Sequence, residues 1–205
     1  MTKIKLTKGE LKRQRDALKQ YRRYLPTLQL KKQQLQIEIL RQGRAIAEKR
    51  KEESEKRNAI EAWAGLLSDA EVNMKLWIAP RNVVTGLRNI AGVDIPDFER
   101  VEFEAAEYDF FTAPLWVDTA IDELKTLVSL RIEIETIERG IKILKGELRV
   151  TAQRVNLFEK VKIPEAEVAI RLIKIYIGDQ MTNAVGRSKI AKKKIEQSVL
   201  EGVSA

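Results

Sequence analysis

One stretch of this 205-residue chain decides its fold, and it reads Leu127-Val-Ser-Leu-Arg-Ile-Glu-Ile-Glu-Thr-Ile-Glu-Arg-Gly-Ile-Lys-Ile-Leu-Lys-Gly-Glu-Leu148. Apolar residues recur in it at steps of three and four, which places them on one helix face as the seam of a coiled coil. The N-terminal third of the chain carries the same repeat. We therefore predict a mainly α fold, a long antiparallel two-helix coiled coil with a small β-hairpin insert between the helices.

The phase of the repeat assigns seam residues to each helix. In the first helix the predicted seam residues are Leu18, Tyr21, Leu25, Leu28, Leu35, Ile39, Ile46, Ile60, Trp63, Leu67, Met74 and Trp77. In the second helix they are Leu127, Ile134, Ile137, Ile141, Leu144, Leu148, Val155 and Phe158. Lys32 interrupts the N-terminal repeat with a charge.

Breaks in the repeat divide the chain into four predicted segments. They are an N-terminal helix over 1–79, a hairpin or irregular insert over 80–112, a C-terminal helix over 113–180 and a basic tail over 181–205. The first boundary follows from Pro80, because a proline disfavours helical geometry in the residue before it. The tail is weakly patterned, so we expect it to fray.

Two prolines and one cap mark the predicted helices. Thr7 and Glu10 have the spacing of a capping box, which starts a helix near residue 8. Pro26 and Pro164 fall inside the helical pattern. Each lacks an N–H donor and crowds the carbonyl four residues earlier, so we predict a kink at both positions.

The insert has a different texture. β-Formers and turn residues predict strands over roughly 82–91 and 99–111, joined by an irregular link over 92–98. A two-stranded hairpin is marginal alone, so its apolar side chains must pack on the helices or on a partner protein. These residues are Val83, Val84, Phe103, Phe110 and Phe111. We expect Trp77 and Trp116 to cluster where the helices meet the insert.

Charge is distributed unevenly along the chain. Residues 1–57 carry 18 Lys/Arg against 7 Asp/Glu, whereas residues 58–126 carry 5 against 13. The run over 49–57 has no apolar residue and reads as a solvated helix with pairs Glu52–Lys56 and Glu53–Arg57, or else as a binding site. Fields of this kind favour partners of opposite charge.

The residue inventory argues against an enzyme acting alone. The chain has no His and no Cys, so triads, thiolate sites and the usual zinc motifs are excluded. It also lacks a phosphate-binding glycine loop, and its acidic pairs alternate between faces. We predict no catalytic residue, cofactor or metal. The N-terminus lacks an apolar signal core and no apolar run approaches about 18 residues, so we expect a soluble intracellular protein.

Several motifs resemble one family over nearly the whole chain. They are Leu6-Thr-Lys-Gly-Glu-Leu-Lys-Arg-Gln-Arg15, Tyr24-Leu-Pro-Thr-Leu-Gln-Leu-Lys-Lys32, Asn89-Ile-Ala-Gly-Val-Asp-Ile-Pro96 and Gln153-Arg-Val-Asn156 through Ile163-Pro164. They are similar to the D subunit of the V-type, also called A-type, rotary ATPases. The Pro-Thr-Leu-Gln-Leu-Lys-Lys text departs from the commoner family version and resembles its bacterial members.

The resemblance implies a non-catalytic rotor shaft in the central stalk. It implies that the paired helix ends enter a hexamer of catalytic A and non-catalytic B subunits, coupling ATP hydrolysis or synthesis to proton or sodium transport through a membrane ring. The insert and lower coiled coil would contact the small F subunit, and the foot would rest on the funnel-shaped C subunit, at the cytoplasmic face of the membrane. The basic side chains expected to face the hexamer are Lys12, Arg13, Arg15, Arg22, Arg23, Arg154, Lys192, Lys193 and Lys194.

Two other readings compete with this one. The basic N-terminal segment fits a coiled-coil protein that binds nucleic acid or acidic surfaces, although it lacks the interleaved aromatics that stack on bases. The shaft of F-type ATPases is analogous, but it carries a larger α/β insert than the roughly 30 residues available here.

Overall fold

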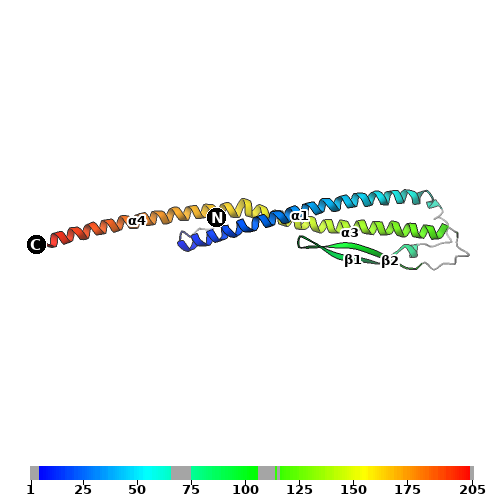
Figure 1. Cartoon of the computed structure of the whole chain (residues 1–205), viewed down its shortest axis with the longest axis horizontal. Helices are drawn as coiled ribbons and strands as arrows, with labels where there is room; N and C mark the ends of the chain where they lie inside the picture. Colours follow the sequence, from blue (N-terminus) through cyan, green and yellow to red (C-terminus); the bar gives the residue numbers. More distant parts are fainter. Residues whose placement is uncertain (1–4, 66–74, 106–113, 115, 204–205) are drawn as a thin grey trace. The chain divides into compact units, whose positions relative to one another are not determined.

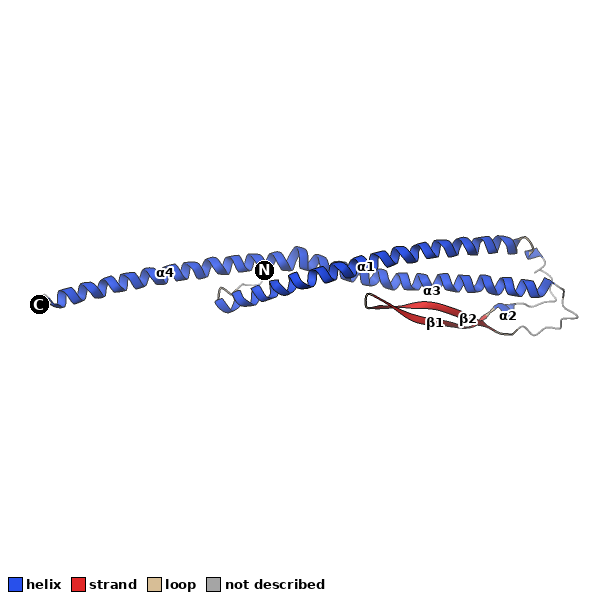
Figure 2. Cartoon of the chain, in the orientation of Figure 1, coloured by secondary structure: helices blue, strands red, loops and turns tan. Residues whose placement is uncertain are grey.

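The structure is a computed structural model that describes residues 5–65, 75–105, 114 and 116–203. Its elements follow in the order α1 (Lys8–Glu61), α2 (Lys75–Ile78), β1 (Pro80–Ile90), β2 (Val93–Phe103), α3 (Trp116–Leu157), a π-helical turn (Phe158–Lys162) and α4 (Ile163–Val203). Figures 1 and 2 show long helices, with the hairpin of β1 and β2 lying alongside α3. The predicted mainly α fold with a hairpin insert is confirmed.

The chain forms two compact units. The terminal unit comprises Met1–Gln29 and Gln153–Ala205, and the middle unit comprises Leu30–Ala152. Helices α1 and α3 contribute residues to both units. The ends of the chain therefore fold together, and the hairpin belongs to the other unit.

The terminal unit pairs the start of α1 with α4 and the end of α3. The rings of Tyr21 and Phe158 lie 5.3 Å apart, and Arg22 Nη2 lies 2.6 Å from Glu167 Oε1. The buried residues of this unit are Val155, Ala166, Ala169 and Ile173. Small alanines on α4 leave room for the larger side chains of α1 in this antiparallel packing.

The middle unit packs α1, α3 and the hairpin around one apolar cluster. Leu35 of α1, Ile95 of β2 and Leu144 of α3 are almost fully buried and in mutual contact. A second cluster forms at the other end of the unit around Val117, with Trp63, Trp77 and Trp116 packed against it. The predicted grouping of Trp77 with Trp116 is confirmed.

The start of α1 shows half of the predicted capping box. Thr7 Oγ1 accepts a hydrogen bond from the backbone N–H of Glu10 at 3.2 Å. The Glu10 carboxylate does not reach back to Thr7; it accepts instead from Gln14 Nε2 at 2.7 Å. The N–H of Thr7 donates to the carbonyl of Lys5 at 3.0 Å.

Two predicted helix ends differ from the structure. Helix α1 ends at Glu61 and not near residue 79, because Trp63 turns into the cluster around Val117 and its N–H bonds the carbonyl of Ile60. The C-terminal segment does not fray at Gly178; α4 continues to Val203. Side chains along this stretch bond within the helix, as when Ser188 Oγ donates to the Ala184 carbonyl at 3.0 Å.

The hairpin is tighter than predicted. Its strands are Pro80–Ile90 and Val93–Phe103, joined by the two residues Ala91 and Gly92, which both have positive φ (52° and 76°). This geometry matches the right-handed twist of the strands, and Gly adopts it without strain. Ala91 offsets the cost of its own positive φ by packing against the cluster of Leu35 and Leu144. The expected irregular link over 92–98 is wrong.

Strand β2 accommodates its proline because a two-stranded sheet consists of edges only. Pro96 pairs with Leu87 and needs no donor on its outer side. The register shifts once near Pro80 and once at Val84, where β2 carries Glu99 as an extra residue. These shifts bend the strands along the helices.

Candidate functional site

The described seam residues all lie inside the helix packing to some degree. Leu35, Ile46, Ile60, Ile134, Leu144 and Val155 are buried, and the other described seam residues are half-buried. Leu67 and Met74 lie outside the described residues. The seven-residue phase therefore identified inward-facing positions in both units.

The seven-residue repeat also includes polar residues of α1, which the apolar pattern did not assign to the seam. Gln42 is buried, Lys49 and Lys56 are half-buried, and all three lie at seam positions of α1. Gln42 Nε2 donates to Glu38 Oε1 at 3.3 Å, while Gln42 Oε1 finds no partner among the described residues. A sequence search that had extended the heptad through polar residues would have found this layer.

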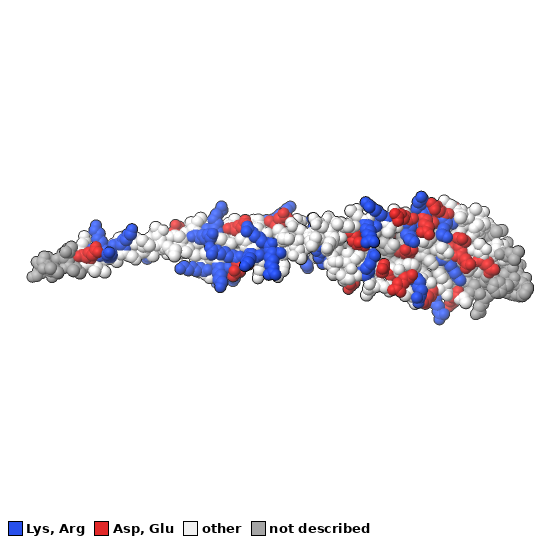
Figure 3. Space-filling model, in the orientation of Figure 1, with Lys and Arg blue, Asp and Glu red and all other residues white. Residues whose placement is uncertain are grey.

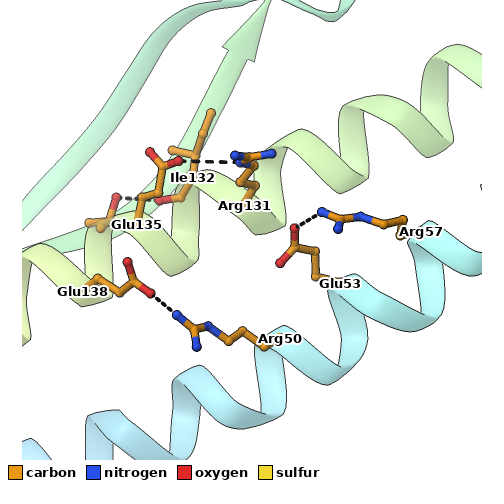
Figure 4. A network of polar contacts seen from close by, with 8 residues as sticks. Arg50, Glu53, Arg57, Arg131, Ile132, Glu135 and Glu138 are labelled. Carbon is orange, nitrogen blue, oxygen red and sulfur yellow. Dashed lines mark hydrogen bonds and ion pairs between the residues drawn. The ribbon is translucent and has the colours of Figure 1, made fainter.

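The charged run of α1 is bound to α3 by ion pairs. Lys49 Nζ lies 3.1 Å from Glu133 Oε2, Arg50 Nη2 lies 2.5 Å from Glu138 Oε1, and Lys56 Nζ lies 3.6 Å from Glu123 Oε2. Figure 4 shows Arg50 reaching across to Glu138, and it shows Glu53 pairing with Arg57 along α1. From Arg50 to Lys56 along α1, the partner on α3 moves back from Glu138 to Glu123, as in an antiparallel pair.

These contacts correct part of the prediction for residues 49–57. The pair Glu53–Arg57 is present at 2.9 Å, but Glu52 pairs with Lys49 and not with Lys56. Lys56 turns to α3 because Glu123 faces it there. The hydrogen bond to Glu133, with added attraction from Glu133 and Glu52, raises the pKa of Lys49 above its usual 10.5.

The hairpin is held against the helices near its turn. Arg88 Nη2 of β1 lies 3.5 Å from Glu38 Oε1 of α1, and Ile95 of β2 is 1% exposed against Leu35 and Leu144. Near its open end, Lys125 of α3 stands over the ring of Phe103 at 5.8 Å. Val83, Val84 and Phe103 are half-buried, and Phe110 and Phe111 lie outside the described residues.

Polar side chains also tie the two strands to each other. Asn89 Nδ2 donates to Asp94 Oδ1 at 2.6 Å, and the Gly92 N–H donates to Asn89 Oδ1 at 3.1 Å. Arg100 donates to Glu102, and this bond, with a second one from Asn82, lowers the pKa of the Glu102 carboxyl below its usual 4.5. Arg100 and Glu102 both lie on β2, whereas Asn89–Asp94 and Asn82–Glu102 are cross-strand contacts, which stabilise a hairpin.

All nine predicted basic residues belong to the terminal unit and are exposed. This unit carries 19 Lys/Arg against 8 Asp/Glu, whereas the middle unit carries 19 against 22. Figure 3 shows basic side chains predominating over the terminal unit and both signs mixed over the middle unit. Arg13, Arg22 and Lys192 make ion pairs; among the described residues the other six make none: Lys12, Arg15, Arg23, Arg154, Lys193 and Lys194.

One face of α1 in the middle unit is apolar and exposed. Leu30, Ile37 and Leu40 are 55–66% exposed and recur at helical spacing. Ile37 and Leu40 line an open groove that also reaches Leu148 of α3. Clustered apolar side chains on a surface mark interaction sites more often than isolated ones do.

The described part of the chain holds no group of three or more acidic, His or Cys side chains that could bind a metal ion. Within the same residues, no helix has the length and apolar character needed to cross a bilayer.

Comparison with known proteins agrees with this geometry. The sequence profile of the family described as the D subunit of ATP synthase matches residues 10–193. The chain belongs to this family. It is 46% identical to the V-type ATP synthase D subunit of Borreliella burgdorferi, across 95% of this chain and 96% of that protein. It is 37% identical to the Chlamydia muridarum protein of the same name, across 96% and 98%, and 35% identical to that of Chlamydia pneumoniae, across 94% and 93%.

Membership of this family assigns the chain to a protein complex. It is a structural stalk subunit of a rotary V-type ATPase, it is not catalytic, and it works within that complex. ATP synthesis and ion transport are properties of the assembly. The alternative of a basic coiled coil that binds nucleic acid is not favoured, because the chain matches proteins named V-type ATP synthase D subunit over nearly its whole length.

Proposed function

We propose that the terminal unit is the part of this stalk protein that enters the axial cavity of the hexamer of A and B subunits. The observation that carries this proposal is that all nine basic side chains are exposed and belong to the one unit in which α1 pairs with α4. Exposed ion pairs contribute little free energy each, so such a surface can form and release contacts as it turns. A rotor needs contacts of this kind, since a tightly bound shaft would not rotate.

The middle unit would bind the remaining stalk proteins. The exposed apolar face of Leu30, Ile37 and Leu40, together with the hairpin, is suited to the small F subunit, and the opposite end of the unit would rest on the C subunit. In this proposal the complex lies on the cytoplasmic face of the membrane, peripheral to a membrane ring. A bend at Pro26 within the continuous helix α1, together with the π-helical turn before Pro164, would make the shaft eccentric, so that rotation biases each catalytic interface differently.

Cross-linking in the purified complex tests these assignments. The chain has no Cys, so single Cys substitutions give unambiguous attachment points. Arg23→Cys in the terminal unit should cross-link to A or B, and Ile37→Cys in the middle unit should cross-link to the small F subunit. Ser54→Cys, exposed on α1 outside both surfaces, is the matched control. Adducts of Ile37→Cys with A or B, and of Arg23→Cys with the small F subunit, would reverse the proposal.

A further inference from the structure

The charged run of α1 divides the middle unit into segments of different strength. From Glu48 to Asn58 the helix has no apolar side chain. On one side of this run the seam is closed by Leu35 and Ile46, and on the other side by Ile60. Apolar burial holds the flanking segments, whereas the run itself is held to α3 by three ion pairs.

All three ion pairs remain partly exposed and do not replace an apolar seam; the side chains of Lys49 and Glu133 are 35% and 24% exposed. The side chains of Arg50 and Glu138 are 62% and 44% exposed, and those of Lys56 and Glu123 are 32% and 45% exposed. Exposed pairs contribute little free energy each, and salt screens them over distances that shrink from about 30 Å at 10 mM to about 3 Å at 1 M ionic strength. Burial of one leucine contributes more free energy and does not depend on such screening.

The stretch of α3 that faces the run is well packed. Along α3, Leu130, Ile134 and Thr136 are nearly inaccessible to solvent. The α1 run also has its own support as a helix, because Lys51 pairs with Glu55 and Arg57 with Glu53. The run can therefore stay helical when the interhelix pairs are lost.

We propose that residues 48–58 of α1 form a salt-sensitive joint, at which α1 separates from α3 without unfolding while the flanking apolar seam stays closed. The three interhelix ion pairs set its stiffness. In a protein that carries torque, such a joint confines bending to one short segment. The joint follows from contacts within the chain and does not depend on the partners proposed above.

Distances between spin labels in the full-length chain test the joint. Labels on Ser54→Cys and Thr126→Cys span the charged run, and labels on Gln34→Cys and Lys145→Cys span the apolar seam; all four side chains are exposed. Between about 10 mM and about 1 M salt, the 54–126 distance should broaden and shift to longer values while the 34–145 distance stays constant. Helix content by circular dichroism should not change.

Two double variants assign the effect to the ion pairs. Lys49→Leu with Glu133→Leu restores an apolar layer and should suppress the salt-induced shift, whereas Lys49→Glu with Glu133→Lys keeps a pair and should retain the shift. An unchanged 54–126 distance, an equal shift of both label pairs, or a parallel loss of helix content would each overturn the proposal. If the Leu–Leu variant still shows the full salt-induced shift of the 54–126 distance, the Lys49–Glu133 pair does not control the joint.

Discussion

Gly140 of α3 faces the side-chain amide of Gln42 of α1 across the coiled coil. A Cβ at Gly140 would lie 3.5 Å from Gln42 Oε1 and 3.7 Å from the Cβ of Ile95 in the hairpin. The two helices and the hairpin thus meet around one missing side chain. The spacing is nevertheless that of ordinary van der Waals contact, so the site has room for one methyl group.

Gly140→Ala should therefore stabilise the protein. Ala is favoured over Gly inside a helix by about 0.5–1 kcal/mol, and we expect the free energy of unfolding to rise by that amount in urea titrations. Gly146→Ala in the same helix, with nothing within 4 Å, is the matched control and should show the same gain. If Gly140→Ala lowers the free energy of unfolding while Gly146→Ala raises it, the packing around Gln42 does not have room for the added methyl group.

Ile95 should be the main apolar attachment of the hairpin. It is 1% exposed, and removal of a buried Ile side chain leaves a cavity that costs about 2–5 kcal/mol. Ile95→Ala should lower the free energy of unfolding by about that amount. Leu87→Ala on the facing strand, where Leu87 is 80% exposed, should change it by less than about 0.5 kcal/mol. Equal effects of the two changes would show that the hairpin is not seated by this contact.

The sequence predicted this architecture well because the apolar repeat is long and regular. Positions such as Leu35, Leu144 and Val155 followed from the period alone, since a heptad repeat places them on one stripe. The same principle located the insert, where period two replaces period seven. Rules based on neighbouring residues did not predict two features that depend on residues distant in the sequence. The positive φ of Ala91 depends on packing against Leu35 and Leu144. The end of α1 depends on the packing of Trp63 against Val117.

The polar contacts were the least predictable part of the site. Glu52 and Lys56 have suitable spacing for a pair within α1, yet Lys56 pairs with Glu123 because α3 brings a second carboxylate within reach. Such choices differ by fractions of a kcal/mol and depend on the neighbouring helix. The exposed basic residues could be identified from sequence, but their distribution between the two units required the fold.

Lys49 should make a stabilising contribution that disappears only in strong alkali. Its hydrogen bond to Glu133 raises its pKa above 10.5 in the folded chain, so the folded state binds the proton more tightly than the unfolded state does. The resulting stabilisation is complete below pH 10.5 and is lost as the pH rises through the raised pKa. The difference in unfolding free energy between the wild type and Lys49→Met should thus be constant near neutral pH and shrink above pH 10.5.

Glu133→Gln provides the control for this effect. It removes the charge that Lys49 faces but keeps a polar side chain at the same position. When Lys49→Met is made in the Glu133→Gln background, the change in unfolding free energy that it causes should lose most of its dependence on alkaline pH. If the dependence persists undiminished, a group other than Glu133 must hold the proton on Lys49.

Pro164 should be the cause of the π-helical turn that precedes α4. Within this turn the N–H of Ile163 donates to the carbonyl of Phe158, five residues earlier. A proline at the next position has no N–H, and its ring would collide with the carbonyl of Lys160 in a regular α-helix, so the wider turn relieves the clash. Pro164→Ala should let the turn close to an α-helix and rotate α4 about its axis relative to its present register, which amide chemical shifts and hydrogen-bond couplings would detect.

Pro26→Ala is the contrasting change, because α1 passes through Pro26 as a continuous helix. It should stabilise the protein by up to about 3 kcal/mol without a change of register, since an interior proline disfavours a helix by that amount. A π-helical turn that survives Pro164→Ala would identify another cause, such as the stacking of Phe158 on Tyr21 at 5.3 Å. In the assembled ATPase, unchanged rotation and coupled hydrolysis in the double variant Pro26→Ala and Pro164→Ala would remove the proposed link between these prolines and torque.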